Sequence, residues 1–136
     1  MSTLEADLIR KVAWRELRTK GCRKQMEIVE TLFMLLVGHA LADFVLQPEA
    51  MGYGKNRNDK VHASESSLFP HWSYWMTGHA LIHGGVVYLI TGSILLGLIE
   101  TLAHWIVDFL KCEGRLSVHQ DQAIHVVCKI GYALAL

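Results

Sequence analysis

Apolar residues in this chain fall into long blocks that are separated by charged stretches. Charge collects in residues 1–30, 49–65 and 111–121. The apolar blocks cover about residues 26–46, 72–91, 94–110 and 119–136. The first three blocks approach the ~20 residues with which an α-helix crosses a ~30 Å hydrocarbon core, and the fourth is shorter. The pattern therefore predicts four long helices.

The two middle blocks favour a membrane over water as their surroundings. Between residues 72 and 110 the only acids are Glu100 and Asp108, and there is no Lys or Arg. A helix that is apolar on all sides contacts lipid or lies in the core of a much larger protein, and 136 residues cannot supply such a core. We therefore expect an all-α fold, a four-helix transmembrane bundle.

Residues 4–20 have a different pattern, which is typical of an amphipathic helix. Its apolar face consists of Leu4, Leu8, Ile9, Val12 and Leu17. This helix either packs on the protein's own surface or lies in the headgroup region, with Trp14 as an anchor. We expect Gly21 to end it, so that residues 1–25 form an amphipathic basic helix and residues 26–136 a four-helix membrane domain. The stretch begins with acidic residues, unlike a signal peptide, so we do not expect a signal peptide here.

Glycine and polar residues predict the connections between the blocks. Residues 48–71 are rich in Gly, Asn, Ser and Lys and are expected to form an irregular loop. Gly92 and Ser93 mark a tight turn between the second and third blocks. Gly84 and Gly85 are expected to permit a close approach between helices.

Polar residues inside the apolar blocks recur in pairs four residues apart, a spacing that places both on one helix face. The pairs are His39 and Asp43, His79 and His83, His104 and Asp108, and Asp121 and His125. In an up-and-down bundle that rises ~1.5 Å per residue, the pairs of the second and third blocks lie at overlapping depths. Those of the first and fourth blocks lie near the same end. We therefore expect all four pairs to converge in one half of the membrane, opposite the N-terminus.

A bound divalent cation would explain why acids and imidazoles converge in lipid. An ionised group near the bilayer centre costs ~2.5–3.5 kcal/mol, and a bound cation returns ~10 kcal/mol or more. Mixed imidazole and carboxylate ligands suit zinc, with manganese and iron as alternatives. Eight candidate ligands exceed the capacity of one tetrahedral ion, which favours a dinuclear site. A proton relay and structural hydrogen bonding are the alternatives.

Further polar residues extend this site. Glu100, one turn from His104, is expected to be a ligand, a hydrogen-bond partner of a ligand or a general base. Asp121 is the other candidate for proton transfer. Gln47 and Gln122 are expected to orient ligands or substrate by hydrogen bonds. An anionic headgroup would be attracted by Lys55, Arg57, Lys60 and Arg115. A solvated charged rim is the alternative for these four residues.

Four motifs of the chain resemble those of a known family. They are HALADFVLQ (39–47), HALIH (79–83), HWIVDFLK (104–111) and DQAIH (121–125). In this order, over about residues 30–128, they are similar to domain-of-unknown-function family 3307, which comprises small bacterial and phage multi-pass membrane proteins. This resemblance implies a membrane fold and no settled activity. A looser similarity, in the HxxxD spacing, is to membrane-bound metal-dependent hydrolases of the LexA-regulated type. The amphipathic N-terminal stretch departs from the family pattern.

Together these observations predict a membrane-embedded metal-dependent hydrolase. Its metals would activate water for attack on a lipid-like substrate, a phosphoester or an amide or ester, at headgroup level. A divalent-cation or proton transporter is one alternative. A phage or host accessory membrane protein with a structural metal is the other.

Composition bounds the partners and the location. A formal net charge of zero gives no electrostatic case for binding of nucleic acid. Three cysteines without a CxxC pair are expected to be free thiols.

Seven Lys and Arg residues precede the first block and five lie on the opposite side. This favours a multi-pass protein of the cell (inner) membrane with a cytoplasmic N-terminus. Membrane lipids are the expected partners, and a homo-oligomer stays open.

Overall fold

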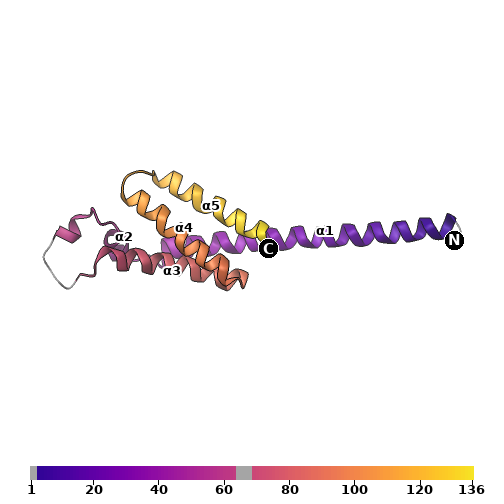
Figure 1. Ribbon diagram of the computed structural model, residues 1–136, viewed down its shortest axis with the longest axis horizontal. Coiled ribbons are helices and arrows are strands. Elements are labelled where there is room, and N and C mark those ends of the chain that lie inside the picture. The colour runs from indigo at the N-terminus through magenta and orange to yellow at the C-terminus, as the bar shows by residue number, and fades with distance from the viewer. Residues whose placement is uncertain (1–2, 64–68) are drawn as a thin grey trace.

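The computed structural model describes residues 3–63 and 69–136, and the regular structure in these ranges is helical (Figure 1). In chain order the elements are α1 (Thr3–Ala40), the π-helical turn η1 (Leu41–Val45), α2 (Glu49–Gly54), the 3₁₀ turn η2 (Lys60–Ala63), α3 (Trp72–Thr91), α4 (Ile94–Cys112) and α5 (Val118–Ala135). The predicted all-α class is confirmed.

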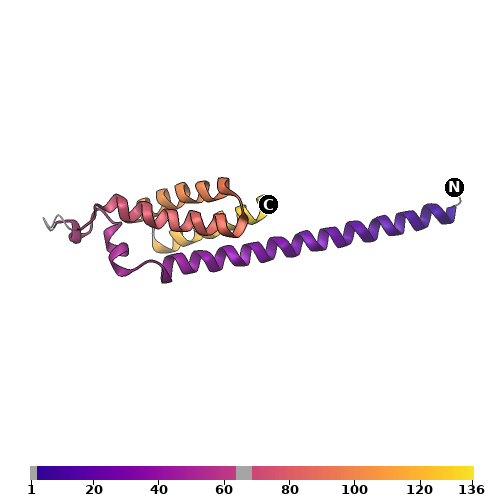
Figure 2. The same cartoon turned by 90° about the horizontal axis from the view of Figure 1, so that it is seen from below.

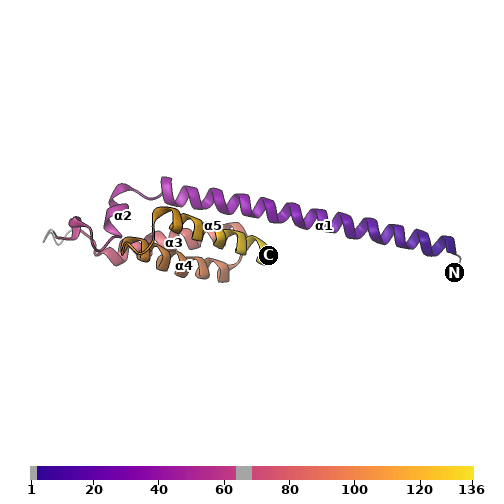
Figure 3. The ribbon, with the colours of Figure 1, turned by 90° about the horizontal axis from the view of Figure 1, so that it is seen from above.

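Four helices form a bundle, and one of them extends far beyond it. The C-terminal half of α1 lies beside α3 and α5, whereas its N-terminal half projects away (Figures 2 and 3). α3 and α4 are antiparallel neighbours joined at Gly92, whose left-handed φ of 68° favours a residue without a side chain. Ser93 then caps α4 by accepting a hydrogen bond from the backbone N–H of Leu96. The alternating directions of the helices enclose one shared interior.

α1 is one continuous helix of 38 residues, so the predicted break at Gly21 is wrong. A glycine inside a helix costs ~1 kcal/mol relative to alanine, which neighbouring helix formers offset. Glycine ends a helix when it adopts the left-handed conformation. Among the described residues only Gly92 and Gly114 have a positive φ. The basic N-terminal stretch therefore continues directly into the apolar segment.

The amphipathic face predicted for residues 4–20 lies outside the described side chains, although the backbone there is helical. These side chains are Leu4, Leu8, Ile9, Val12, Trp14 and Leu17. The contact of residues 1–25 with a membrane surface and the domain boundary at residue 25 stay predictions.

One helical stretch of the described residues, Thr19–Val45, is long and apolar enough to cross a membrane. Core helices of soluble proteins and signal sequences share these properties. α3 carries His79 and His83, and these polar side chains lower its apolar character. Glu100 and Asp108 do the same in α4. The predicted helices are confirmed, whereas four crossings of a membrane are not shown.

Residues 48–71, predicted as an irregular loop, instead contain α2 and η2. Before them, α1 passes into the π-helical turn η1, a feature that is frequent at functional sites. Pro48 starts α2, and Gly54 lies so close to Trp75 of α3 that a Cβ atom there would be 2.5 Å from the indole ring. This contact between α2 and α3 gives the segment a defined structure that its local composition does not indicate.

α3 and α4 approach closely at Gly84 and Gly97. A Cβ atom on Gly84 would clash with the Thr101 side chain and lie 2.5 Å from the carbonyl oxygen of Gly97. A Cβ atom on Gly97 would lie 2.9 Å from the carbonyl oxygen of Gly84. On Gly85, by contrast, a Cβ atom would have nothing within 4 Å. Of the predicted glycine pair, Gly84 therefore permits the close approach.

Replacing Gly84 by alanine is expected to destabilise the protein by about 1–3 kcal/mol, because a methyl group inserted into a close-packed contact forces the helices apart. The matched control is Gly85→Ala, one residue away on α3. It is expected to be neutral or to stabilise by up to ~1 kcal/mol, because alanine is the better helix former. Thermal unfolding in detergent measures both variants, and equal stability would contradict the packing.

Candidate metal centre

The interior of the bundle consists chiefly of polar side chains. Among the described residues, 26 large hydrophobic side chains are exposed and only seven hydrophobic residues are buried. The buried polar or charged residues are His39, Lys55, His79, His83, Glu100, His104, Asp108, Asp121, His125 and Lys129. This distribution is the reverse of that in a water-soluble bundle. The buried polar groups must therefore find their partners among themselves.

The four predicted pairs converge in this interior. The His83 and His104 rings stack with 3.5 Å between their centroids, and the His104 and His125 rings with 4.1 Å. The His39 ring lies 5.2 Å from both the His83 and His125 rings. Neighbouring helices run in opposite directions, so pairs at matching distances from the helix ends reach the same level. The side chains of the four pairs thus lie close together, whereas their place in one half of a membrane stays a prediction.

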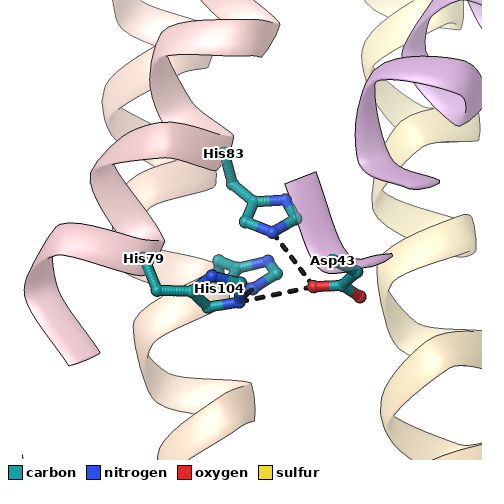
Figure 4. A group of neighbouring side chains, drawn as sticks. All are labelled: Asp43, His79, His83 and His104. Carbon is teal, nitrogen blue, oxygen red and sulfur yellow. Dashed lines mark hydrogen bonds and ion pairs between the residues drawn. The ribbon is translucent and has the colours of Figure 1, made fainter. Parts of the chain in front are cut away.

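Four donor groups from three elements point at one another in Figure 4: Asp43 of η1, His79 and His83 of α3, and His104 of α4. Asp43 Oδ1 lies 3.1 Å from His83 Nε2 and 3.3 Å from His79 Nε2. The Nε2 atoms of His79 and His104 are 3.2 Å apart. Three imidazoles and one carboxylate thus face a common centre.

These separations fit ligands around one metal ion. Four donors bound to zinc at ~2.0–2.1 Å lie ~3.3–3.4 Å apart along the edges of a tetrahedron. The three measured separations of 3.1, 3.3 and 3.2 Å agree with such edges. The three histidines are at most 1% exposed, and the Asp43 side chain is 11% exposed. All four ligand atoms lie within 4.8 Å of one another, so these residues could hold a metal ion.

Two further groups of donors adjoin this one. They are Glu100, His104 and His125, and Asp108, Asp121 and His125. Because His104 and His125 are shared, the three groups form one continuous cluster. Seven of the eight predicted ligands belong to it, and His39 lies beside it. His39 Nε2 lies 3.2 Å from Gln122 Oε1, and His39 Nδ1 has no hydrogen-bond partner.

Asp108 is bound by two lysines. Lys55 Nζ lies 2.5 Å from Asp108 Oδ2 and donates a second hydrogen bond of 2.6 Å to Gln47 Oε1. Lys111 contacts Asp108 Oδ1 and lies 3.1 Å from Asp121 Oδ2. Two cations therefore compensate this pair of acids. The sequence gives no signal for Lys55, because only the fold of α2 brings it to Asp108.

Lys129, on the part of α5 that is distant from the α4–α5 turn, compensates the charge of Glu100. Its Nζ lies 2.6 Å from Glu100 Oε1, and both residues are at most 1% exposed. The sequence does indicate the position of Lys129, because Asp121, His125 and Lys129 follow one another at intervals of four residues and so share one helix face. Three lysines therefore provide counter-charges in the interior, so a bound cation is not needed for every acid.

The basic residues predicted to attract a headgroup lie in different surroundings. Lys55 is only 4% exposed, because its ion pair holds it in the interior. Arg57 binds the Glu113 carboxylate through two hydrogen bonds of 2.7 Å, which lower the pKa of Glu113. Lys60 and Arg115 are exposed. The predicted basic rim is therefore reduced to Arg57, Lys60 and Arg115.

Gln122 joins three of the predicted ligands. Its amide nitrogen donates to Asp43 Oδ2 at 2.9 Å and to Asp121 Oδ2 at 3.2 Å. Its Oε1 is the atom that faces His39. Gln122 therefore lies where it can orient ligands, whereas Gln47 contacts the cluster only through Lys55.

A pocket of about 360 Å³ opens at the end of the bundle where α2 and the α4–α5 turn lie. Asp43 and Asp121 are in its wall, together with both lysines that bind Asp108. Asp121 Oδ1 is buried and lies 3.5 Å from His125 Nε2 without a hydrogen bond. Phe44 and Val118, which are exposed apolar residues, also line it. The cluster is thus open toward this end of the molecule.

The other end of the bundle is apolar. Its core consists of Leu35, Val87, Tyr132 and Ala133, with further hydrophobic side chains packed against it. Along α1, α3 and α5 these residues lie beyond the cluster, on the side of the α3–α4 turn. The polar interior therefore faces the pocket on one side and an apolar core on the other.

The family described as "Protein of unknown function (DUF3307)" matches residues 31–134. This range contains every donor of the cluster and all four motifs. No curated protein and no solved structure matches the chain. The similarity to metal-dependent hydrolases of the LexA-regulated type therefore has no support from a named relative.

Replacing Lys55 by methionine is expected to destabilise the protein by about 3 kcal/mol, because removal of one partner leaves a buried carboxylate without its counter-charge. Lys60→Met, at an exposed position on the same segment, is the control and is expected to change stability by less than ~0.5 kcal/mol. Unfolding midpoints in detergent compare the two. A Lys55 variant as stable as the Lys60 variant would show that the ion pair contributes nothing.

Proposed function

Because the chain belongs to the family described as "Protein of unknown function (DUF3307)", whose description assigns no activity, we propose its function from the site alone. We propose a membrane-embedded, metal-dependent hydrolase that binds one divalent cation and acts on a lipid-like substrate at headgroup level. One observation carries this proposal. The Asp43 carboxylate and three imidazoles lie at the spacing of metal ligands, beside a pocket that reaches Asp43.

The distribution of apolar residues supports a membrane location for the whole bundle. Large exposed hydrophobic side chains occur on every long helix, for example Phe33 on α1, Leu89 on α3, Leu102 on α4 and Val127 on α5. Such a surface is costly in water and favourable in lipid. Charged groups within the bundle are paired, as intramembrane charges must be. We therefore retain four crossings of the cell membrane as part of the proposal.

The charges of the cluster favour one metal ion over the two proposed from the number of donors. Four carboxylates face three lysines. The carboxylates are those of Asp43, Glu100, Asp108 and Asp121, and the lysines are Lys55, Lys111 and Lys129. One divalent cation changes the residual charge from one negative to one positive, whereas two would leave three positive charges in a low-dielectric interior. A mononuclear site is therefore the better proposal.

Asp43 is the acid at which a cation meets the least repulsion. Glu100, Asp108 and Asp121 each contact a lysine. The partners of Asp43, by contrast, are imidazoles and the Gln122 amide. Three imidazoles and one carboxylate suit zinc, with manganese and iron as alternatives.

Asp121 is the better of the two candidates for proton transfer. A bound divalent cation would supply an acidified water and polarise a phosphoryl or carbonyl oxygen. Asp121 lines the pocket beside Asp43, and its Oδ1, 3.5 Å from His125 Nε2, makes no hydrogen bond. Both carboxylates are buried, but Glu100 does not line the pocket. Its Oε1 lies 3.4 Å from His104 Nδ1, which suits a residue that orients a ligand.

The pocket wall suggests an amphipathic, anionic substrate. Lys111 offers a cation to it, with 24% of its side chain exposed. Phe44 and Val118 offer apolar contacts at the same opening. A phosphorylated lipid headgroup with its acyl chains combines both properties, so a phosphoester is the favoured substrate class and an amide or ester the alternative.

A structural metal is the second candidate, and the number of donors favours it. Four protein ligands complete a tetrahedron, as in structural zinc sites, whereas catalytic sites keep a position for water. Hydrolysis therefore requires a fifth ligand, which the opening of the pocket beside Asp43 permits. A phage or host accessory membrane protein with a structural ion would need no such position.

A transporter fits the geometry less well. A conduction path needs polar groups through the whole thickness of the bundle. Here the cluster is followed by the apolar core that contains Leu35 and Val87.

The cytoplasmic location proposed for the N-terminus rests on the basic residues of α1, among them the exposed Lys20, Arg23 and Lys24.

His83→Ala is expected to lower the metal content of the purified protein from one ion per chain to nearly none, because it removes a central donor. His119→Ala, which changes an exposed histidine at the start of α5, is the control and should keep the ion. Elemental analysis of detergent-purified protein gives both values. Equal metal content in the two variants would refute the ligand assignment.

Asp121→Asn is expected to retain the metal and to lose at least ~10²-fold in turnover, because it removes the proton acceptor beside the pocket. The assay uses a fluorogenic phosphate monoester and a fluorogenic acyl ester, each in mixed micelles. Glu49→Gln, at an exposed carboxylate near the same end, controls for a general loss of charge. A wild-type protein that holds one ion and cleaves neither substrate would favour the structural metal.

A further inference from the structure

A second set of metal donors lies away from the pocket, on the other side of His104. Glu100, His104 and His125 each offer a ligand atom, and these atoms lie within 4.8 Å of one another. All three residues are at most 1% exposed. Glu100 Oε2 has no hydrogen-bond partner. His104 Nδ1 and His125 Nε2 each face only a carboxylate oxygen, at 3.4 Å and 3.5 Å, without making a hydrogen bond. Buried polar atoms without partners are rare in proteins, so their grouping around one place needs a cause.

Lys129 supplies a cation to this second set. Its Nζ lies 2.6 Å from Glu100 Oε1 and 5.8 Å from the centroid of the Tyr132 ring. The side chain is 1% exposed. An ammonium group that is held between a carboxylate and the face of an aromatic ring is well fixed. The second set therefore already contains one positive charge in a defined position.

We propose that Lys129 is a built-in cation that takes the place of a second metal ion and restricts the centre to one. This inference rests on the proposed metal site at Asp43. A divalent cation at Glu100 would meet the ammonium group at a distance of a few ångströms, in surroundings that screen charge weakly. The lysine thus determines the metal stoichiometry of the site, although it is not itself a ligand.

His104 connects the two sets and gives Lys129 a second effect. Its Nε2 faces His79 in the first set, while its Nδ1 lies 3.4 Å from Glu100 Oε1 in the second. A histidine that binds a metal through one nitrogen donates a hydrogen bond from the other, most often to a carboxylate or carbonyl. By holding Glu100 as an ionised acceptor, Lys129 keeps His104 oriented toward the first set. Binding of a second ion at Nδ1 would remove that orienting proton.

The test measures how many zinc or manganese ions the full-length protein binds in detergent at saturation. Lys129→Glu replaces the cation by a fourth possible donor, and two ions in this variant leave the same residual charge as one ion in the wild type. We expect one ion per chain in the wild type and two in Lys129→Glu. Lys129→Arg keeps a cation and should bind one. Lys129→Gln, a neutral variant, should admit a second ion more weakly and decides the question if Lys129→Glu does not fold.

The outcomes separate this inference from the function on which it rests. A wild type that binds no ion at all would contradict the proposed metal site. A wild type that binds one ion, with variants that also bind only one at saturation, would overturn the assignment of Lys129 alone. A wild type that takes up two ions would do the same, because the lysine would then exclude nothing.

Discussion

Charges that leave water must be matched within the protein, and this constraint governs the interior of the bundle. Carboxylates, imidazoles and lysines occupy the space that hydrophobic side chains fill in a soluble helical bundle. Each acid contacts a lysine or a set of imidazoles, and the imidazoles face one another. The close approach at Gly84 and Gly97 allows α3 and α4 to bring their polar faces together. Charge balance therefore constrains the packing of the helices and would limit which cations the proposed site accepts.

Much of the fold could be predicted because apolar blocks and helix breakers are local signals. The block at residues 72–91 coincides with α3, because Gly92 adopts the left-handed conformation that ends a helix. The same reasoning failed at Gly21, because a glycine can stay helical when its neighbours are good helix formers. It also failed for α2, whose position depends on the contact between Gly54 and Trp75. Contacts between distant segments leave no local pattern.

The site was predictable to the extent that it depends on periodicity. The spacing of four residues and the alternating helix directions are enough to bring His83, His104 and His125 together. The same spacing marks Lys129, but lysine is not a metal ligand, so a pattern of metal donors does not include it. Nothing in the sequence places Lys55 inside the bundle. A count of donors alone therefore favours two ions, whereas the cations that the chain itself supplies favour the single ion proposed above.

The continuity of α1 has a mechanical consequence. A helix of 38 residues is a rod about 57 Å long, at ~1.5 Å per residue, and only its C-terminal half lies against α3 and α5 (Figure 2). The π-helical turn that bears Asp43 follows it without a break. A tilt of the projecting N-terminal half is therefore expected to be transmitted along the helix and to shift the Asp43 carboxylate.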